Sequence, residues 1–152
     1  MRKLLFLVGP LALLGACATL GPTPDSDDAA QDRAHLYFKT LRWEGPRASA
    51  ALLAPELRRE YLDRINAESL EKKIKITDFD VKELGHLSKN AVTLGADLSW
   101  YLEPGVTVKH EEVTLHLEFR NGSWMVTGID GGPLPIAPLT PAPAQPVDGG
   151  AP

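Results

Sequence analysis

One stretch of strict alternation constrains the fold of this chain more than any other feature. From Val92 to Leu102, apolar residues occupy every second position, and polar or small residues fill the positions between them. Successive side chains of a β-strand point to opposite faces, so this pattern predicts a long strand with one buried and one partly hydrated face. A turn is expected just before it, over 85–90.

A two-residue turn predicts how the last two strands pair. Asn121-Gly122 is a preferred sequence for a type I′ hairpin turn, because both positions need a positive φ. A loop of two residues also sets the register of the strands on either side of it. The expected cross-strand pairs are Phe119 with Trp124, Leu117 with Val126, and Leu115 with Gly128.

Two more strands are expected, each with a change of phase. The apolar positions of 74–76 and those of 79–83 alternate in opposite phases, which predicts a bulge at Thr77-Asp78. The strand expected over 106–120 also changes phase, so a second bulge is predicted between Lys109 and Glu112.

The first half of the chain has helical periodicity instead. The acidic stretch 25–28 supplies capping side chains and favourable charge for a helix that ends just past Trp43. A short helix is expected over 47–54, and Pro55 suits the first turn of a third helix. The stripes expected in the core are Ala30, Ala34, Tyr37, Phe38 and Leu41 in the first helix, and Leu57, Tyr61 and Ile65 in the third.

Helices followed by three to four long antiparallel strands define a single α+β domain, expected over 25–130, with the helices on the concave face of a curved sheet. This order resembles the nuclear transport factor 2-like superfamily, a cone of curved sheet closed by N-terminal helices, and the hairpin 121–129 is the closest match. The resemblance implies an interior that is either a ligand cavity or a filled core, and a small domain favours the filled core. The residues expected to line that interior are Phe38, Leu98, Trp100, Phe119 and Trp124.

The N-terminal sequence predicts where the protein is located. Arg2 and Lys3 precede an apolar run that is too short to span a bilayer, as in a secretory signal peptide. The run ends in Leu14-Gly15-Ala16-Cys17, which resembles the lipobox of bacterial lipoproteins. The resemblance implies that 1–16 is a signal peptide whose peptidase recognises Leu14, Gly15 and Ala16, and that Cys17 receives the lipid.

The residues after Cys17 extend that interpretation. Two or three acyl chains such as palmitate hold a protein firmly on a membrane. Residues 17–24 then form the lipidated N-terminus and a short tether. Ala18 is not the aspartate that often retains lipoproteins in the inner membrane, so the resemblance favours the outer membrane, facing the periplasm.

At the other end, 131–152 is rich in proline, alanine and glycine. That composition is typical of extended segments without a core of their own. The sequence therefore predicts a disordered tail, which is either a spacer or a dispensable end.

The charge composition limits the classes of partner that are expected. The chain has 16 Lys and Arg against 20 Asp and Glu, and loss of the signal peptide would make it more acidic still. Nucleic acids are bound through basic patches, so no nucleic-acid partner is expected. The expected partners are the membrane, through the acyl chains on Cys17, and an envelope protein.

No catalytic, cofactor or metal motif stands out. The sequence lacks a phosphate loop, a dinucleotide fingerprint, a CxxC pair and HExxH. His110 and His116 share a strand with glutamates, but the polar face of a strand explains them without a metal. Asp97 and Tyr101 fall in the polar phase of the long strand and are expected to point outward. No catalytic residue, cofactor or metal site is therefore predicted.

Two functions remain open. The sequence favours a membrane-anchored envelope lipoprotein whose domain binds a partner or acts as a scaffold without catalysis. The alternative is a cone-fold small-molecule binder or enzyme that uses an apolar cavity.

Overall fold

The structure is a computed structural model that describes residues 25–139. The predicted signal peptide (1–16), with the lipobox at its end, and the lipidated N-terminus and tether (17–24) lie outside the described residues, as does the tail from residue 140 onward. Within 25–139, no helix has the length and apolar character needed to cross a membrane.

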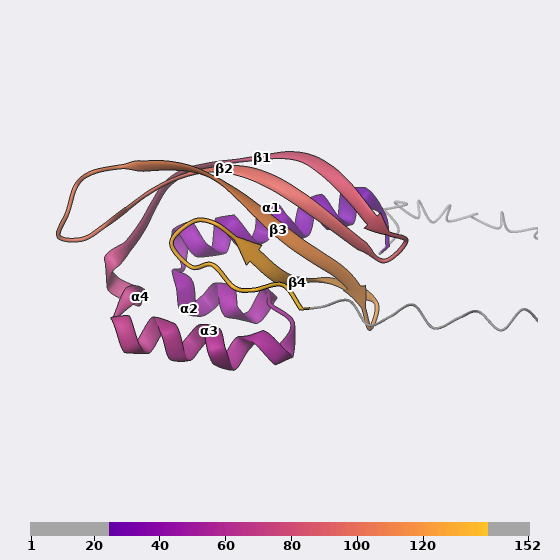
Figure 1. Cartoon of the computed structure of the whole chain (residues 1–152), viewed down its shortest axis with the longest axis horizontal. Coiled ribbons are helices and arrows are strands. Elements are labelled where there is room, and N and C mark those ends of the chain that lie inside the picture. The colour runs from indigo at the N-terminus through magenta and orange to yellow at the C-terminus, as the bar shows by residue number, and fades with distance from the viewer. Residues whose placement is uncertain (1–24, 140–152) are drawn as a thin grey trace, which may run out of the picture.

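Four strands form one antiparallel sheet in the order β1-β2-β3-β4, and the sheet arches over the helices (Figure 1). The predicted α+β class is thereby confirmed. The helical elements are α1 (Asp27–Trp43), α2 (Pro46–Ser49), the 3₁₀ turn η1 (Ala50–Leu52), α3 (Pro55–Glu68) and α4 (Leu70–Lys73). The strands are β1 (Ile74–Ser88), β2 (Ala91–Leu102), β3 (Lys109–Arg120) and β4 (Ser123–Asp130).

Local sequence sets where α1 and α3 begin, and a contact with β4 sets where the helical segment between them ends. The Ser26 side chain caps α1 by accepting a hydrogen bond from the Ala29 amide at 3.2 Å. Pro55 opens α3, as expected. The helix predicted over 47–54 is instead α2 followed by η1. Its last two residues leave the helix because Leu53 and Ala54 pair with β4, where the Ala54 amide donates to Val126 O at 2.8 Å. All expected stripe residues of α1 and α3 are buried.

The predicted long strand is confirmed as β2. The strands on either side of it, β1 and β3, end or begin at other residues than predicted. The predicted bulge at Thr77-Asp78 is present as a register shift between β1 and β2. The predicted turn over 85–90 is wrong in length, because β1 continues to Ser88 through further register shifts. The predicted strand start at Val106 and the bulge after Lys109 are also wrong. The residues 106–108 form an exposed loop, so β3 keeps a single phase against β2 without a shift.

The β3–β4 register matches the prediction near the turn only. Phe119 pairs with Trp124 and Leu117 with Val126, as expected. The expected pair of Leu115 with Gly128 is wrong, since Leu115 pairs with Ile129. A register shift between His116 and Leu117 leaves one extra residue, Thr127, in β4. This shift lets both Val126 and Ile129 be buried, which an unbroken alternation would not allow.

The predicted domain end at Asp130 is also wrong, because the chain folds back along the free edge of β4. Leu134 and Ile136 are only 2% and 1% exposed. Ile136 exchanges two backbone hydrogen bonds with Ile129, and the Leu139 amide donates to Thr127 O at 2.8 Å. Composition alone gave no sign of this, because the apolar residues are spaced between prolines.

Three buried hydroxyl groups tie the helices together. Ser49 donates to Pro46 O at 2.8 Å and lies 2.9 Å from the Tyr61 hydroxyl, which in turn lies 3.4 Å from the Tyr37 hydroxyl. Because Ser49 donates to a carbonyl, a consistent chain has Tyr37 donating to Tyr61 and Tyr61 donating to Ser49. Residues of α1, α2 and α3 are thus linked inside the core, where an unmatched hydroxyl is costly.

Cutting the chain should separate the real domain end from the predicted one. A chain that ends at Asp130 should lose about 3–5 kcal/mol of unfolding free energy, because the buried Leu134 and Ile136 are removed. A chain that ends at Leu139 should lose at most about 1 kcal/mol, since it keeps these contacts. Urea denaturation measures both, and equal losses would contradict the assigned edge segment.

Replacing Tyr61 with Phe should lower the unfolding free energy by about 1–2 kcal/mol, because the buried Tyr37 hydroxyl loses its acceptor. Burial raises the pKa of Tyr37 and Tyr61 above the ordinary 10.0. Their contribution is therefore complete below pH 10.0 and is lost as the pH rises from there through the raised pKa of the folded state. Denaturation at a series of pH values should therefore show a steeper alkaline loss in the wild type than in Tyr61→Phe. Tyr101→Phe is the control and should change neither quantity.

Candidate binding groove on the outer face of the sheet

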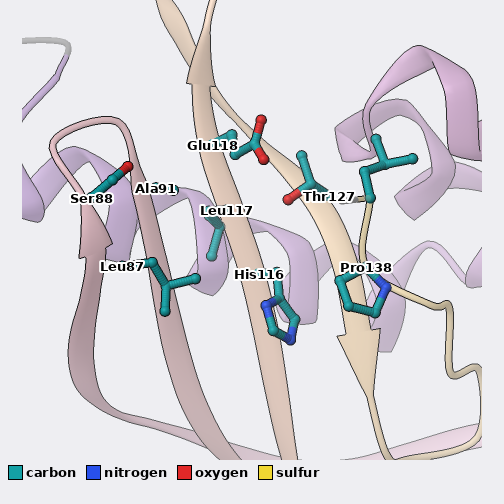
Figure 2. A pocket seen from close by; sticks show the side chains of 9 residues that line it. Leu87, Ser88, Ala91, His116, Leu117, Glu118, Thr127 and Pro138 are labelled. Carbon is teal, nitrogen blue, oxygen red and sulfur yellow. The ribbon is translucent and has the colours of Figure 1, made fainter. Parts of the chain in front are cut away.

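An apolar groove crosses the outer face of the sheet, on the side away from the helices. It encloses about 410 Å³. Figure 2 shows Leu87 and Pro138 on opposite sides of His116, with the strands running between them. The residues that line this outer-face groove are Leu87, Ser88, Ala91, His116, Leu117, Glu118, Thr127, Pro138 and Leu139.

The β1–β2 hairpin supplies one wall. Leu87 lies near the end of β1 and is 64% exposed, which is unusual for a leucine on a sheet. Ala91 opens β2 and pairs with Glu118 of β3, so both face outward at the same level. The alternation that buries Leu117 in the core therefore turns its neighbours His116 and Glu118 toward the groove.

The segment after β4 supplies the opposite wall, and Gly128 holds it close. A Cβ atom on Gly128 would lie 2.5 Å from Cα of Pro138, which is closer than real contacts allow. The missing side chain therefore lets Pro138 lie directly on β4. Leu139 is fixed next to it by its hydrogen bond to Thr127 O.

Charged groups border the groove without converging on a reacting centre. His116 Nε2 lies 2.7 Å from Asp130 Oδ2. Arg120 Nε donates to Glu118 at 2.7 Å, and its Nη1 reaches Glu56 of α3 at 3.2 Å. Ser88 Oγ accepts from the Asn90 amide at 3.3 Å and forms no hydrogen bond with His116 among the described residues. The groove therefore presents a surface for apolar contact, with no assembled nucleophile and base in the described part of the chain.

The five residues expected to line an interior space do not share one. Phe38 and Leu98 meet at a void of only about 10 Å³, which Trp100, Phe119 and Trp124 do not line. The Trp100 indole instead donates to Glu111 at 2.9 Å, and Phe119 packs edge-on against Trp124 at 5.6 Å. A void of that size holds at most one water, so the space at Phe38 and Leu98 is a filled core.

Asp97 of β2 faces outward as the alternation predicted, and the absence of the predicted bulge in β3 puts His110 and His116 on one face. Asp97 is exposed and forms an ion pair with Lys82 at 2.6 Å. His110 and His116 share the outer face, six positions apart on a regular strand, which separates them by about 20 Å. No group of three or more potential metal ligands occurs within residues 25–139.

The groove was not predicted from the sequence, because the residues of its two walls were expected to lie in a turn and in a disordered tail. Leu87 fell in a predicted turn, and Pro138 and Leu139 fell in a predicted tail. One signal was present in the sequence: Gly128 interrupts an apolar strand, and a glycine there often marks a bulge or a close approach of another backbone.

Adding one methyl group at Gly128 should displace the Pro138 wall. We expect Gly128→Ala to lower the unfolding free energy by about 1–3 kcal/mol and to expose the Leu139 amide to hydrogen exchange. Gly95→Ala is the matched control on β2, because the nearest atom to its new Cβ would be 3.8 Å away. Its effect should stay within about 0.5 kcal/mol. Equal effects of the two variants would contradict the close Gly128–Pro138 contact.

Comparisons with known proteins give likenesses of shape only. No protein-family model matches the chain, and no curated protein matches it. The chain is similar to the solution structure of a SEC-C motif-containing protein from Rhodopseudomonas palustris, with a TM-score of 0.48 and 12% identity over 72% of this chain and 81% of that one. It is also similar to the crystal structure of the intermembrane space region of the chloroplast protein ARC6, with a TM-score of 0.45 and 12% identity over 72% of this chain and 92% of that one. Neither likeness bears on the function of this chain.

Proposed function

We propose that this chain is a lipid-anchored protein of the bacterial envelope whose domain binds a protein partner through the outer-face groove. In this proposal Cys17 carries the acyl chains and the domain acts as a binding or scaffold module without catalysis. The membrane in question is the outer membrane, with the domain facing the periplasm.

The observation that carries the binding role is the contrast between the two sides of the sheet. The inner side holds a void of about 10 Å³ at Phe38 and Leu98, whereas the outer side holds an apolar groove of about 410 Å³. Monomeric proteins rarely leave contiguous apolar surface open unless it contacts something. This contrast supports a partner site on the outer side of the sheet.

The geometry of the N-terminus supports a site close to the membrane. Asp27, at the start of α1, lies 3.2 Å from His86, the neighbour of Leu87 in the groove wall. Residues 18–24 between Cys17 and the domain span at most about 25 Å when extended. An anchored Cys17 would thus hold the groove end of the domain within a few nanometres of the bilayer.

The alternative of a small-molecule site inside the cone has less support. It needs a space that the contacts of Phe38 and Leu98 leave almost filled. The proposed kinship with the nuclear transport factor 2-like superfamily is a separate matter, supported by the order of the elements and by the curved sheet over the helices (Figure 1). That kinship by itself assigns no activity.

One experiment in membranes tests both parts of the proposal. Wild-type chain should sediment with membranes, and Cys17→Ser should appear as an unprocessed precursor or in the soluble fraction. A photoreactive residue at position 87 should crosslink the anchored chain to a discrete protein, whereas one at position 106 should not. Val106 is the matched control, because it is 85% exposed at the other end of β2 and β3.

The two readouts fail separately. Membrane retention of Cys17→Ser would contradict the lipid anchor and leave the groove untouched. Equal adducts from positions 87 and 106, or none from position 87, would contradict the groove as the contact surface.

A further inference from the structure

The described part of the chain ends in the wall of the outer-face groove. Leu139 is the last described residue and is itself part of the groove wall. Thirteen residues, 140–152, follow it. These residues are therefore attached at the groove. Their binding to it would cost less loop-closure entropy than the binding of a segment distant in the sequence.

The free edge of β4 offers them no path. The segment 134–139 runs along that edge as far as Thr127, whose carbonyl accepts from the Leu139 amide. The next edge carbonyl, Val126 O, is already bonded to the Ala54 amide. The next edge carbonyl is therefore not free to pair with a residue after Leu139, and Pro138 lies on Gly128 beside the outer-face groove.

We propose that residues 140–147 lie across the outer-face groove as a strap, from Leu139 on the β4 side to Leu87 on the β1 side. Four neighbouring strands place β1 about 14 Å from β4, since the spacing between strands is about 4.8 Å. A proline-rich segment advances about 3.1 Å per residue, so five residues cover about 15 Å. Ala144 therefore reaches the level of Leu87.

The chemistry of this stretch suits an apolar surface. Residues 140–147 carry no charge, and the prolines at 141, 143 and 146 have no amide hydrogen that needs an acceptor. Each proline also favours an extended conformation in the residue before it, which lowers the entropy lost on docking. The strap thus covers apolar wall residues and brings fewer backbone donors to them than a chain without prolines would.

Charge sets where the strap ends. Glu118 lines the groove, and Asp130 borders it next to His116. The first charged residue of the tail is Asp148. Like charges repel, so the acidic border favours departure of the chain from the groove after Val147.

The strap has a consequence for partner binding that rests on the proposed function. It occupies the surface assigned to the partner, so a partner must displace residues 140–147 to bind. Docking of the strap itself needs neither a membrane nor a partner.

Disulfide equilibrium measures the docking directly. In the full chain with Cys17→Ser, the pair Leu87→Cys and Ala144→Cys is equilibrated with glutathione, and the fraction of closed disulfide gives the effective concentration of the two thiols. The control pair combines Ala144→Cys with Ala51→Cys. Ala51 is exposed in η1, three residues before Ala54, whose amide bonds to Val126 O of β4, and it does not line the groove.

Docking predicts an effective concentration at least about tenfold higher for the 87–144 pair than for the 51–144 pair, because an undocked tail visits both walls by random reach. A smaller ratio overturns the proposal. The pair Ser88→Cys and Ala144→Cys repeats the measurement on the neighbouring residue, which guards against a local effect of replacing Leu87. The result does not depend on lipid or partner, so it stands apart from the outcome of the membrane experiment.

Discussion

The hydrogen bonds on the outer edge of β4 are the constraint on which the rest of this structure depends. The amides of Ala54 and Leu139 donate to the carbonyls of Val126 and Thr127, respectively. Ile136 exchanges two backbone hydrogen bonds with Ile129. An open edge strand would leave these backbone groups free to pair with another chain. The same bonds also fasten the helical half to the sheet through η1 and fix one wall of the outer-face groove. The opposite edge, β1, has charged residues and repeated register shifts instead, which make it a poor template for a neighbouring strand.

Local patterns predicted most of the fold, and the failures around β4 have one physical origin. The helix starts, the stripe of α3 and the alternation of β2 follow from capping and periodicity, which act within a few residues. The predictions failed where a distant segment decides the conformation. Thr127 is inserted into β4 because Val126 and Ile129 must both face the core, and residues 134–139 are ordered only by their pairing with β4. The groove wall at Pro138 and Leu139 was missed for the same reason, whereas Leu87 was missed because β1 continues into the residues predicted as a turn.

The interior and exterior of the sheet play different roles. Inside, the contacts of Phe38 with Phe79 and Tyr37 fill space with aromatic rings, and the hydroxyl chain from Tyr37 to Ser49 satisfies the polar groups that the rings bring with them. A core satisfied in this way gains nothing from a ligand. Outside, Leu87 remains exposed although the same sheet could have carried a polar residue there at no structural cost. The exposed apolar surface at Leu87 therefore lies on the outer face of the sheet, where it does not contribute to the core of the domain.

The groove and the N-terminal end of the domain lie together, and this placement limits how a partner can approach. The contact between Asp27 and His86 holds the start of α1 against the hairpin that carries Leu87. A chain anchored through Cys17 would keep that hairpin near the lipid, while the loop after β2 would point away from it. A partner bound in the groove would then also lie near the membrane, where a soluble protein must compete with the bilayer for space. A segment attached at Leu139 would meet no such obstacle, because Leu139 is itself part of the groove wall.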